Sequence, residues 1–175
     1  MIFIFNLGLI PFAEKFAIIC QMSKKVAKKI VMVSGGFDPV HIGHVRMFEE
    51  AKKLGDELVV LLNNDNWLRL KKGYAFMPEH ERKEIIEAFK AVDRVILTSH
   101  EPDTKDISIS NDLRTIRPHV FAKGGDRHPS GVPIPSPEVL VCNEIGCEII
   151  YDIGHGGKVQ SSSELVEKVK NNKKK

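Results

Sequence analysis

The sequence predicts an α/β protein in which one parallel sheet lies between two layers of helices. Short β-branched apolar runs, such as Ile30–Val33, alternate along the chain with longer segments of helical periodicity. This alternation is typical of parallel strands joined by right-handed helical crossovers. A glycine-rich turn follows the first such strand, at the edge where sheets of this kind bind ligands. We therefore expect a Rossmann-like three-layer α/β/α sandwich with a five-stranded parallel sheet.

The elements follow in order from the apolar runs and from the turn residues between them. The predicted strands lie near residues 29–34, 57–63, 93–98, 118–122 and 147–152. The predicted helices lie near residues 43–54, 78–90, 106–116, 135–145 and 162–171. The proline-rich segment 128–137 is expected to be a loop that borders a substrate pocket.

The length of 175 residues predicts one domain, which we place at residues 23–171. Residues 1–22 are an apolar N-terminal extension that need not belong to the native domain, because Met22 begins an ordinary polar start. Asn6 and Pro11 interrupt the extension, which is shorter than the ~20 apolar residues that span a bilayer. We expect no membrane segment, and residues 172–175 form a basic tail.

Composition favours a compact protein, with 42% hydrophobic and 28% charged residues. The net charge of +3 equals the excess of five lysines over two glutamates in residues 164–175, so the remainder is neutral and no nucleic-acid partner is expected. Three cysteines, Cys20, Cys142 and Cys147, form no Cys-x-x-Cys pair. They indicate neither a disulfide framework nor a zinc site, and they favour a reducing cytoplasm.

The residues Gly35–His44 form the most informative segment. Gly35 and Gly36 allow a sharp turn and a close approach of ligand to backbone. The helix that opens near Gly43 directs free N–H groups and the positive end of its dipole at the turn, which favours an anion. His41 and His44 lie three residues apart, so both imidazoles can donate to phosphate oxygens, although such pairs are often structural. The segment predicts a site for nucleotide phosphates.

The motif His41-Ile42-Gly43-His44 resembles the His-x-Gly-His signature of the nucleotidyltransferases related to class I aminoacyl-tRNA synthetases. The chain is too short for a synthetase with its anticodon-binding module, and it is more similar to the small cytidylyltransferase-like enzymes. The resemblance implies that the two histidines stabilise the triphosphate and the charge that develops at the α-phosphorus. It also implies a magnesium ion that arrives with the nucleotide, and no metal ligands in the protein itself.

Further segments resemble the same family in the same order. Leu70-Lys71-Lys72-Gly73-Tyr74 is similar to the basic loop of glycerol-3-phosphate cytidylyltransferases, and Arg82 matches an arginine of the following helix. Lys123-Gly124-Gly125-Asp126 looks like a segment of bacterial heptose 1-phosphate adenylyltransferases, and Ser161-Ser162-Ser163 stands where relatives carry Ser-Thr-Thr.

These resemblances imply three groups of site residues. The catalytic residues would be His41, His44 and Lys71. Nucleotide binding would fall to Gly35, Gly36, Phe37, Asp38, Gly43, Lys123, Gly124, Gly125, Asp126, Ser161, Ser162 and Ser163. Acceptor binding would fall to Lys72, Arg82 and Arg127, although Arg127 stands where adenylyl-type relatives usually carry an aromatic residue.

Each assignment has a structural alternative. Lys71 and Lys72 could be an ordinary solvated pair, and Arg82 could make surface ion pairs worth about 0 to 1 kcal/mol. One of the serines is expected to cap the last helix, which is compatible with phosphate binding. The glycines at 124 and 125 could serve only a turn, and Asp38 could fix the turn before Pro39.

The predicted reaction transfers a nucleoside monophosphate from a nucleoside triphosphate to a phosphorylated small molecule and releases pyrophosphate. An acceptor phosphate is already a nucleophile, so positioning and charge neutralisation suffice. The 123–126 segment favours ATP and a sugar phosphate such as heptose 1-phosphate, whereas the 70–82 segment favours CTP and glycerol 3-phosphate. A non-catalytic nucleotide-binding regulator is the alternative of another class, and small relatives are commonly homodimers.

Overall fold

The computed structural model describes residues 28–124, 136–154 and 159–172. Its five strands are β1 (Ile30–Gly35), β2 (Glu57–Leu62), β3 (Arg94–Leu97), β4 (Val120–Gly124) and β5 (Glu148–Ile153). All neighbouring strands are parallel, and their order in the sheet is β3-β2-β1-β4-β5. The prediction of a five-stranded parallel sheet is confirmed, with strand ends that differ by one or two residues from the predicted ends.

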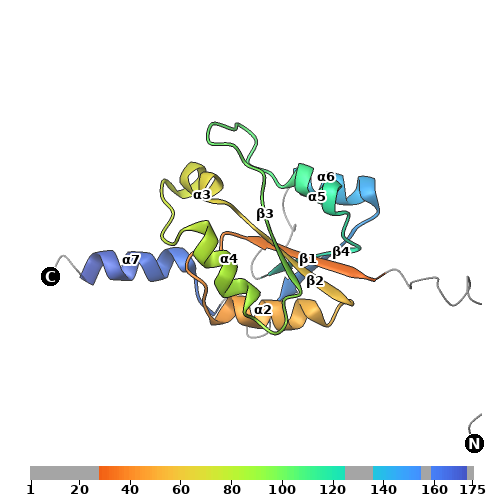
Figure 1. Ribbon diagram of the computed structural model, residues 1–175, viewed down its shortest axis with the longest axis horizontal. Coiled ribbons are helices and arrows are strands. Elements are labelled where there is room, and N and C mark those ends of the chain that lie inside the picture. Colours follow the sequence, from red (N-terminus) through yellow and green to blue (C-terminus); the bar gives the residue numbers. More distant parts are fainter. Residues whose placement is uncertain (1–27, 125–135, 155–158, 173–175) are drawn as a thin grey trace, which may run out of the picture.

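The described residues form six helices beside these strands, and Figure 1 shows how they are arranged. They are α2 (Ile42–Lys52), α3 (Asp65–Lys72), α4 (Glu79–Glu87), α5 (Ser110–Ile116), α6 (Pro137–Ile145) and α7 (Ser162–Asn172). Five of them occupy the predicted positions, and α3 was not predicted. The described residues include no helix that is long and apolar enough to cross a membrane.

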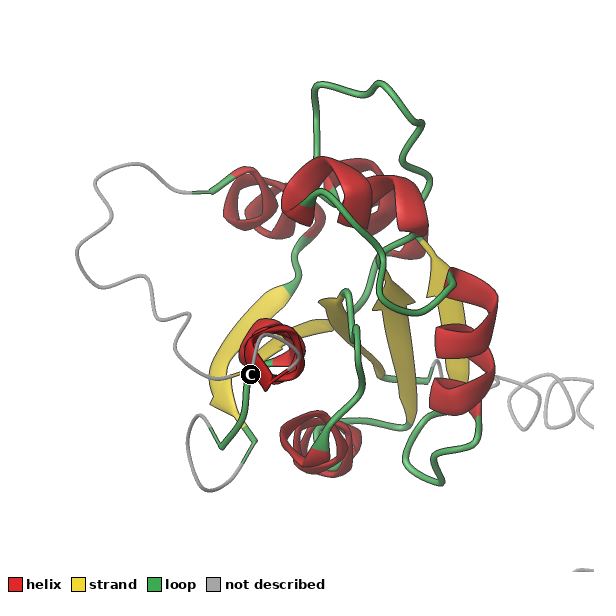
Figure 2. Ribbon diagram, turned by 90° about the vertical axis from the view of Figure 1, so that its left-hand side faces the viewer, coloured by secondary structure: helices red, strands yellow, loops and turns green. Residues whose placement is uncertain are grey.

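Two apolar cores, one on each face of the sheet, confirm the three-layer sandwich. On one face, Phe48 of α2 and Ile86 of α4 pack against the odd-numbered side chains of β1, such as Val33. On the other face, Leu113 of α5 and Val141 of α6 pack around Met32 and its neighbours. Alternate side chains of a strand point to opposite faces, which explains why the strands are apolar throughout. Figure 2 shows the helices on both sides of the sheet.

Helix α3 replaces most of the basic loop expected around Lys71 and Lys72. Its first turn is capped by Asn64, whose side-chain oxygen accepts a hydrogen bond from the Trp67 N–H at 2.9 Å. Its C-cap is Gly73, which adopts the left-handed conformation with φ of 81°. Asn and Gly at these two positions are the standard signals of a helix start and a helix end. The two lysines therefore occupy the last helical turn.

Helix α7 extends away from the body of the domain (Figure 1), and Val169 on it is 53% exposed. The extension at residues 1–22, most of the proline-rich segment 128–137 and residues 173–175 of the basic tail lie outside the described residues.

Candidate active site

The candidate site is a cavity of about 350 Å³ at the carboxyl edge of the sheet. It lies where β1 and β4 are neighbours, which is the point at which the strand order reverses. Open α/β sheets bind ligands at this point, because the crossovers on the two sides of it leave a crevice between them. The lining comes from the β1–α2 turn, from α3, from the ends of β4 and β5 and from the start of α7.

The turn after β1 has little room for side chains. Phe37 adopts a φ of 47°, which is uncommon for a residue with a side chain, and its ring is buried. A Cβ on Gly35 would lie 2.9 Å from that ring, and a Cβ on Gly36 would lie 2.8 Å from the side chain of Leu68. A side chain at either position would have to displace one of these two neighbours.

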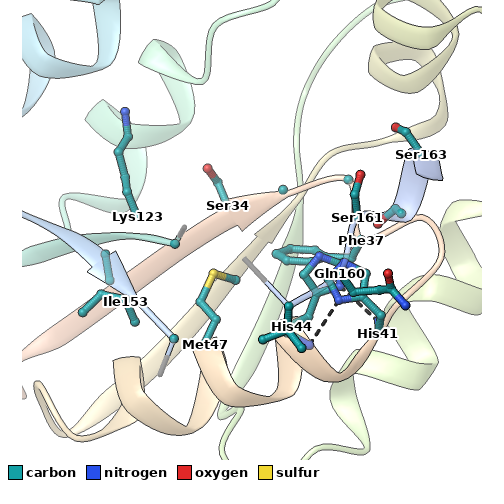
Figure 3. Close-up of a pocket in the computed structure, with 18 of the residues that line it drawn as sticks. Ser34, Phe37, His41, His44, Met47, Lys123, Ile153, Gln160, Ser161 and Ser163 are labelled. Carbon is teal, nitrogen blue, oxygen red and sulfur yellow. Dashed lines mark hydrogen bonds between the residues drawn. The ribbon is translucent and has the colours of Figure 1, made fainter. Parts of the chain in front are cut away.

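His41 and His44 form one unit at the start of α2. His41 is the N-cap, and its Nδ1 accepts from the Gly43 N–H at 3.2 Å. The Nδ1 of His44 accepts in turn from the His41 N–H at 3.3 Å. The two rings stack with centroids 3.6 Å apart, and the His44 ring meets Phe37 edge-on (Figure 3). Because both Nδ1 atoms act as acceptors, both imidazoles carry their proton on Nε2.

Burial and positive neighbours keep this pair neutral. Desolvation, followed by the nearby His41 and Lys72, lowers the pKa of His44 to about 3. Desolvation also lowers the pKa of His41. At neutral pH, each histidine is therefore a hydrogen-bond donor without charge, and the two Nε2–H groups are the donors left for a ligand in the pocket that both residues line.

Gly43 leaves room for this arrangement. A Cβ at this position would lie 3.0 Å from Cε1 and 3.1 Å from Nδ1 of the His41 ring. A larger residue would therefore push the imidazole away from the helix start. The glycine of the His-x-Gly-His motif has this packing role in addition to its place at the helix N-terminus.

Of the two adjacent lysines, Lys72 lines the pocket, whereas Lys71 is exposed and is not among the residues that line it. Desolvation lowers the pKa of Lys72, with opposing contributions from Asp38, which raises it, and from Arg82, which lowers it. The expected assignment of Lys71 to catalysis and of Lys72 to the acceptor is thus not supported by their positions. On the last turn of α3, the two side chains point in different directions because consecutive helical residues lie about 100° apart.

Arg82 is fully buried, which contradicts the expected contact with an acceptor. Its guanidinium donates to the carbonyl oxygens of Met77, Gly36 and Asn63 and pairs with Asp65 at 2.7 Å. The structural alternative, that Arg82 makes ion pairs at the protein surface, is also wrong, because the side chain is not exposed. A side chain with these partners holds loops together and does not reach the cavity.

Asp38 is also buried, at 1% exposure. Its two carboxylate oxygens accept hydrogen bonds from the backbone N–H groups of Phe76 and Met77 at 2.7 and 2.8 Å. The carboxylate therefore fixes the β1–α2 turn to the loop before α4. Asp38 thus has a structural role, although its partners lie in a distant loop and not in the turn before Pro39, as the alternative had it. Asp38 is not among the residues that line the cavity.

The second half of the cavity lies on the other face of the sheet. Ser34 and Lys123 project to the side of the strand ends opposite to the two histidines (Figure 3), as their positions in β1 and β4 require. Phe121 and Trp67 line the same half, and the Trp67 indole donates to Ile107 O at 2.8 Å. Sequence reasoning missed Ser34 and Trp67, and Trp67 could have been found only by recognising α3.

The start of α7 closes the cavity on the side of the histidines. Ser161, Ser162 and Ser163 all line it, as expected for nucleotide-binding residues. The Ser162 hydroxyl donates to the carbonyl oxygen of Pro39 at 3.0 Å, which ties α7 to the β1–α2 turn. Met47, Ile153, Gly154, Val159 and Gln160 also line the cavity and were not predicted.

The remaining predicted residues fall into two groups. Lys123 and Gly124 line the cavity, and a Cβ on Gly124 would lie 2.6 Å from the sulfur of Met47. Gly125, Asp126 and Arg127 lie outside the described residues. Within the ranges 28–124, 136–154 and 159–172, no group of three His, Cys, Asp or Glu side chains could hold a metal ion.

Fold and site together define a class of protein. A parallel α/β sheet whose crevice presents a helix N-terminus, two imidazole donors and a lysine offers groups that suit the phosphates of a nucleotide. Residues 32–149 match the family described as cytidylyltransferase-like. The chain belongs to this family.

Individual proteins agree with this placement. The chain is 31% identical over 166 residues to the bifunctional protein HldE of Pelobacter propionicus, a match that covers 89% of this chain. It is 42% identical over 100 residues to the FAD synthase of Ferroglobus placidus, which covers 57% of this chain. A lipopolysaccharide core biosynthesis protein from Thermoplasma volcanium has a similar crystal structure, with a TM-score of 0.58 and 30% identity.

The extent of these matches differs. The chain spans only 30% of the length of that HldE protein and 61% of that FAD synthase. The comparison with the Thermoplasma protein covers 73% of this chain and 98% of that one. The family match, at residues 32–149, includes the His-x-Gly-His turn of this chain.

Proposed function

We propose that the protein transfers a nucleoside monophosphate, with ATP as the favoured donor, to a phosphorylated small molecule and releases pyrophosphate. The observation that carries this proposal is the pair His41 and His44, whose Nδ1 atoms are both occupied by backbone N–H groups. Their Nε2–H groups remain as neutral donors in a cavity that also contains Lys72 and the start of α7. This set of donors suits a triphosphate chain.

The chemical step requires no nucleophile or general base from the protein. An oxygen of the acceptor phosphate attacks the α-phosphorus, and the bond from that phosphorus to the oxygen bridging the α- and β-phosphates breaks. Pyrophosphate leaves with the magnesium ion that entered with the nucleotide. His41, His44 and Lys72 neutralise the charge that develops on the phosphate oxygens, and the α7 start holds the triphosphate in line.

A sugar phosphate such as heptose 1-phosphate is the acceptor that we favour. The resemblance of Lys123-Gly124 and the following residues to heptose 1-phosphate adenylyltransferases supports this choice, as does the similarity to HldE. The similarity to FAD synthase adds a flavin phosphate as an acceptor, and Trp67 in the second half of the cavity could stack on a flat ring. CTP with glycerol 3-phosphate is the further alternative.

The test is pyrophosphate release with magnesium, in which ATP and CTP are each combined with heptose 1-phosphate, riboflavin 5′-phosphate and glycerol 3-phosphate. We expect release with ATP and one of the first two acceptors. Release with CTP and glycerol 3-phosphate alone would replace the favoured donor. A protein that binds ATP, yet releases no pyrophosphate with any acceptor, would support the non-catalytic regulator instead.

His44→Asn is the variant that tests the pair, because an amide can still accept from the His41 N–H but presents no imidazole Nε2–H. We expect its kcat/KM to fall by ~10²-fold or more, the usual cost of losing one donor to a developing oxyanion. Unchanged turnover in a folded His44→Asn protein would contradict the proposed role of the pair.

Three further features belong to the same proposal. Magnesium is expected to be required only as the nucleotide complex, so that binding of the ion to the protein alone should be weak. We expect a homodimer, which sedimentation would test, and action in the cytoplasm, where nucleoside triphosphates are available.

A further inference from the structure

We propose that Arg82 is a positioning residue of this site, which sets the β1–α2 turn with its two histidines against the helix that carries Lys72. The inference rests on the function proposed above. It concerns a side chain that does not reach the cavity and therefore cannot act on the substrate directly.

The first argument is the set of partners. The guanidinium has five N–H donors, and four hydrogen bonds are seen. Nε donates to Met77 O at 2.9 Å, and NH1 donates to Gly36 O at 2.6 Å and to Asn63 O at 2.8 Å. NH2 pairs with Asp65 Oδ1 at 2.7 Å. One planar group therefore joins four points of the chain.

These four points belong to the segments that build the site. Gly36 lies in the turn between β1 and the N-cap His41, and Asn63 directly follows β2. Asp65 is the first residue of α3, which ends at Lys72. Any change in the position of the guanidinium would therefore alter the separation between the imidazoles and the ammonium group.

The second argument is the network around Met77. Its carbonyl accepts from Arg82, while its N–H donates to Asp38 Oδ1 at 2.8 Å. Asp38 lies in the same β1–α2 turn as the histidines, so the turn is held to the loop before α4 by both a buried carboxylate and a buried guanidinium. Glu79 adds a third link, because its carboxylate accepts from the Asp65 N–H at 2.7 Å.

The third argument is electrostatic. The carbonyl groups of Gly36 and Asn63 stand just beyond the ends of two parallel strands, at the edge where the triphosphate is expected. An unpaired carbonyl oxygen there would repel phosphate. Both oxygens accept a hydrogen bond from NH1 of Arg82. The guanidinium therefore offsets their negative partial charge, which would otherwise repel an anion. The pKa of Lys72 is lowered chiefly by desolvation, and the positive charge of Arg82 contributes in the same direction.

An arginine that only stabilised the fold would not need four hydrogen bonds to separate segments of the chain. Burial of a guanidinium costs several kcal/mol of desolvation, and an apolar side chain of similar size often stabilises a protein as well or better. A planar guanidinium holds several acceptors in fixed directions. The presence of Arg82, which donates to three backbone carbonyls, therefore indicates that these loops need a defined geometry.

The test compares Arg82→Lys with Arg69→Lys. Both arginines contact Asp65, and both changes preserve charge, but Arg69 is exposed and lies 3.5 Å from Asp65 Oδ2. Two quantities are measured: the ¹⁵N spectrum of the histidine side chains without ligand, and kcat and KM for ATP, normalised to the folded fraction. In Arg82→Lys we expect shifted His41 and His44 signals and a kcat lowered ~10²-fold, the effect of about 1 Å of misplacement. In Arg69→Lys we expect both to match wild type.

The outcomes separate the two proposals. Wild-type imidazole signals and wild-type kcat in a folded Arg82→Lys protein would overturn the positioning role. If wild type itself does not turn over, the proposed reaction fails, and the imidazole spectra still decide the role of Arg82. If Arg82→Lys does not fold, Asp65→Asn replaces it, since it leaves the three carbonyl contacts but weakens the anchor at α3. Unchanged spectra and unchanged kcat in Asp65→Asn would then reject the inference.

Discussion

The imidazole rings of His41 and His44 stack 3.6 Å apart, and each uses its Nδ1 to accept a backbone N–H of the same helix turn. The two residues that cap the helix are therefore also the two that we propose as anion donors. The usual N-cap residues satisfy free N–H groups with oxygen atoms. Here the Nδ1 atoms of two imidazoles accept from these N–H groups, and the Nε2–H groups remain available to a ligand.

The two adjacent lysines should differ sharply in their effect on activity. We expect Lys72→Met to lower kcat/KM for the triphosphate by ~10²-fold, because a cation within the cavity is lost. Lys71→Met should change it by less than about threefold, since Lys71 is exposed outside the lining. Steady-state pyrophosphate release measures both. A larger loss in Lys71→Met than in Lys72→Met would show that the lysines exchange roles when substrate binds.

Gly43→Ala should impair the site more than the fold. Its new Cβ would lie within about 3 Å of the His41 ring and displace it. Alanine is otherwise favoured over glycine in a helix by roughly 0.5 to 1 kcal/mol, which should offset much of the strain. We expect a kcat/KM lowered about tenfold and a free energy of unfolding within ~1 kcal/mol of wild type. Ile42→Ala, at the exposed neighbouring position, is the control and should retain activity.

The pKa of His44 predicts how stability changes with pH. An unfolded histidine titrates near pH 6.5 and His44 in the native protein near pH 3, so between these values the unfolded state binds the extra proton. Native stability should therefore fall as pH decreases through this range, by at most about 1.4 kcal/mol per pH unit from this residue. Urea unfolding of wild type and His44→Asn from pH 7 to 4.5 isolates the effect. Parallel curves for the two proteins would contradict it.

Ser162 is expected to hold α7 over the nucleotide. Ser162→Ala removes the hydrogen bond to Pro39 O, which is worth ~1 kcal/mol. We expect KM for the triphosphate to rise about fivefold, and Ser162→Thr, which retains the hydroxyl, to restore most of the affinity. Equal KM values for the alanine and threonine variants, both different from wild type, would assign the effect to packing.

Much of the fold follows from local patterns. The runs at β1 and β2 are apolar on both faces, as expected of strands that are covered on both sides of the sheet. The glycines before His41 mark the turn. Helix α3 was not predicted, because residues 70–74 resemble a loop of related enzymes. Asn64 and Gly73 are the signals in the sequence that mark the start and the end of this helix.

Within the site, arrangements of residues that are close in the sequence could be predicted, and contacts between residues far apart in the sequence could not. His41, Gly43 and His44 are neighbours along the chain, so their arrangement at a helix start could be predicted from spacing alone. The partners of Asp38 and Arg82 lie up to 46 residues away, and no local pattern indicates that a charged side chain will be buried by such distant carbonyls and N–H groups.

The sequence by itself therefore determined the parallel α/β architecture and the position of the two histidines at the turn after the first strand, because hydrophobic periodicity and turn chemistry act over a few residues. Only the tertiary structure decided which lysine faces the cavity, that Arg82 and Asp38 hold loops together, and that Ser34, Trp67 and Lys123 form a second half of the pocket. These properties depend on how helices and strand ends from distant parts of the chain meet at one edge of the sheet.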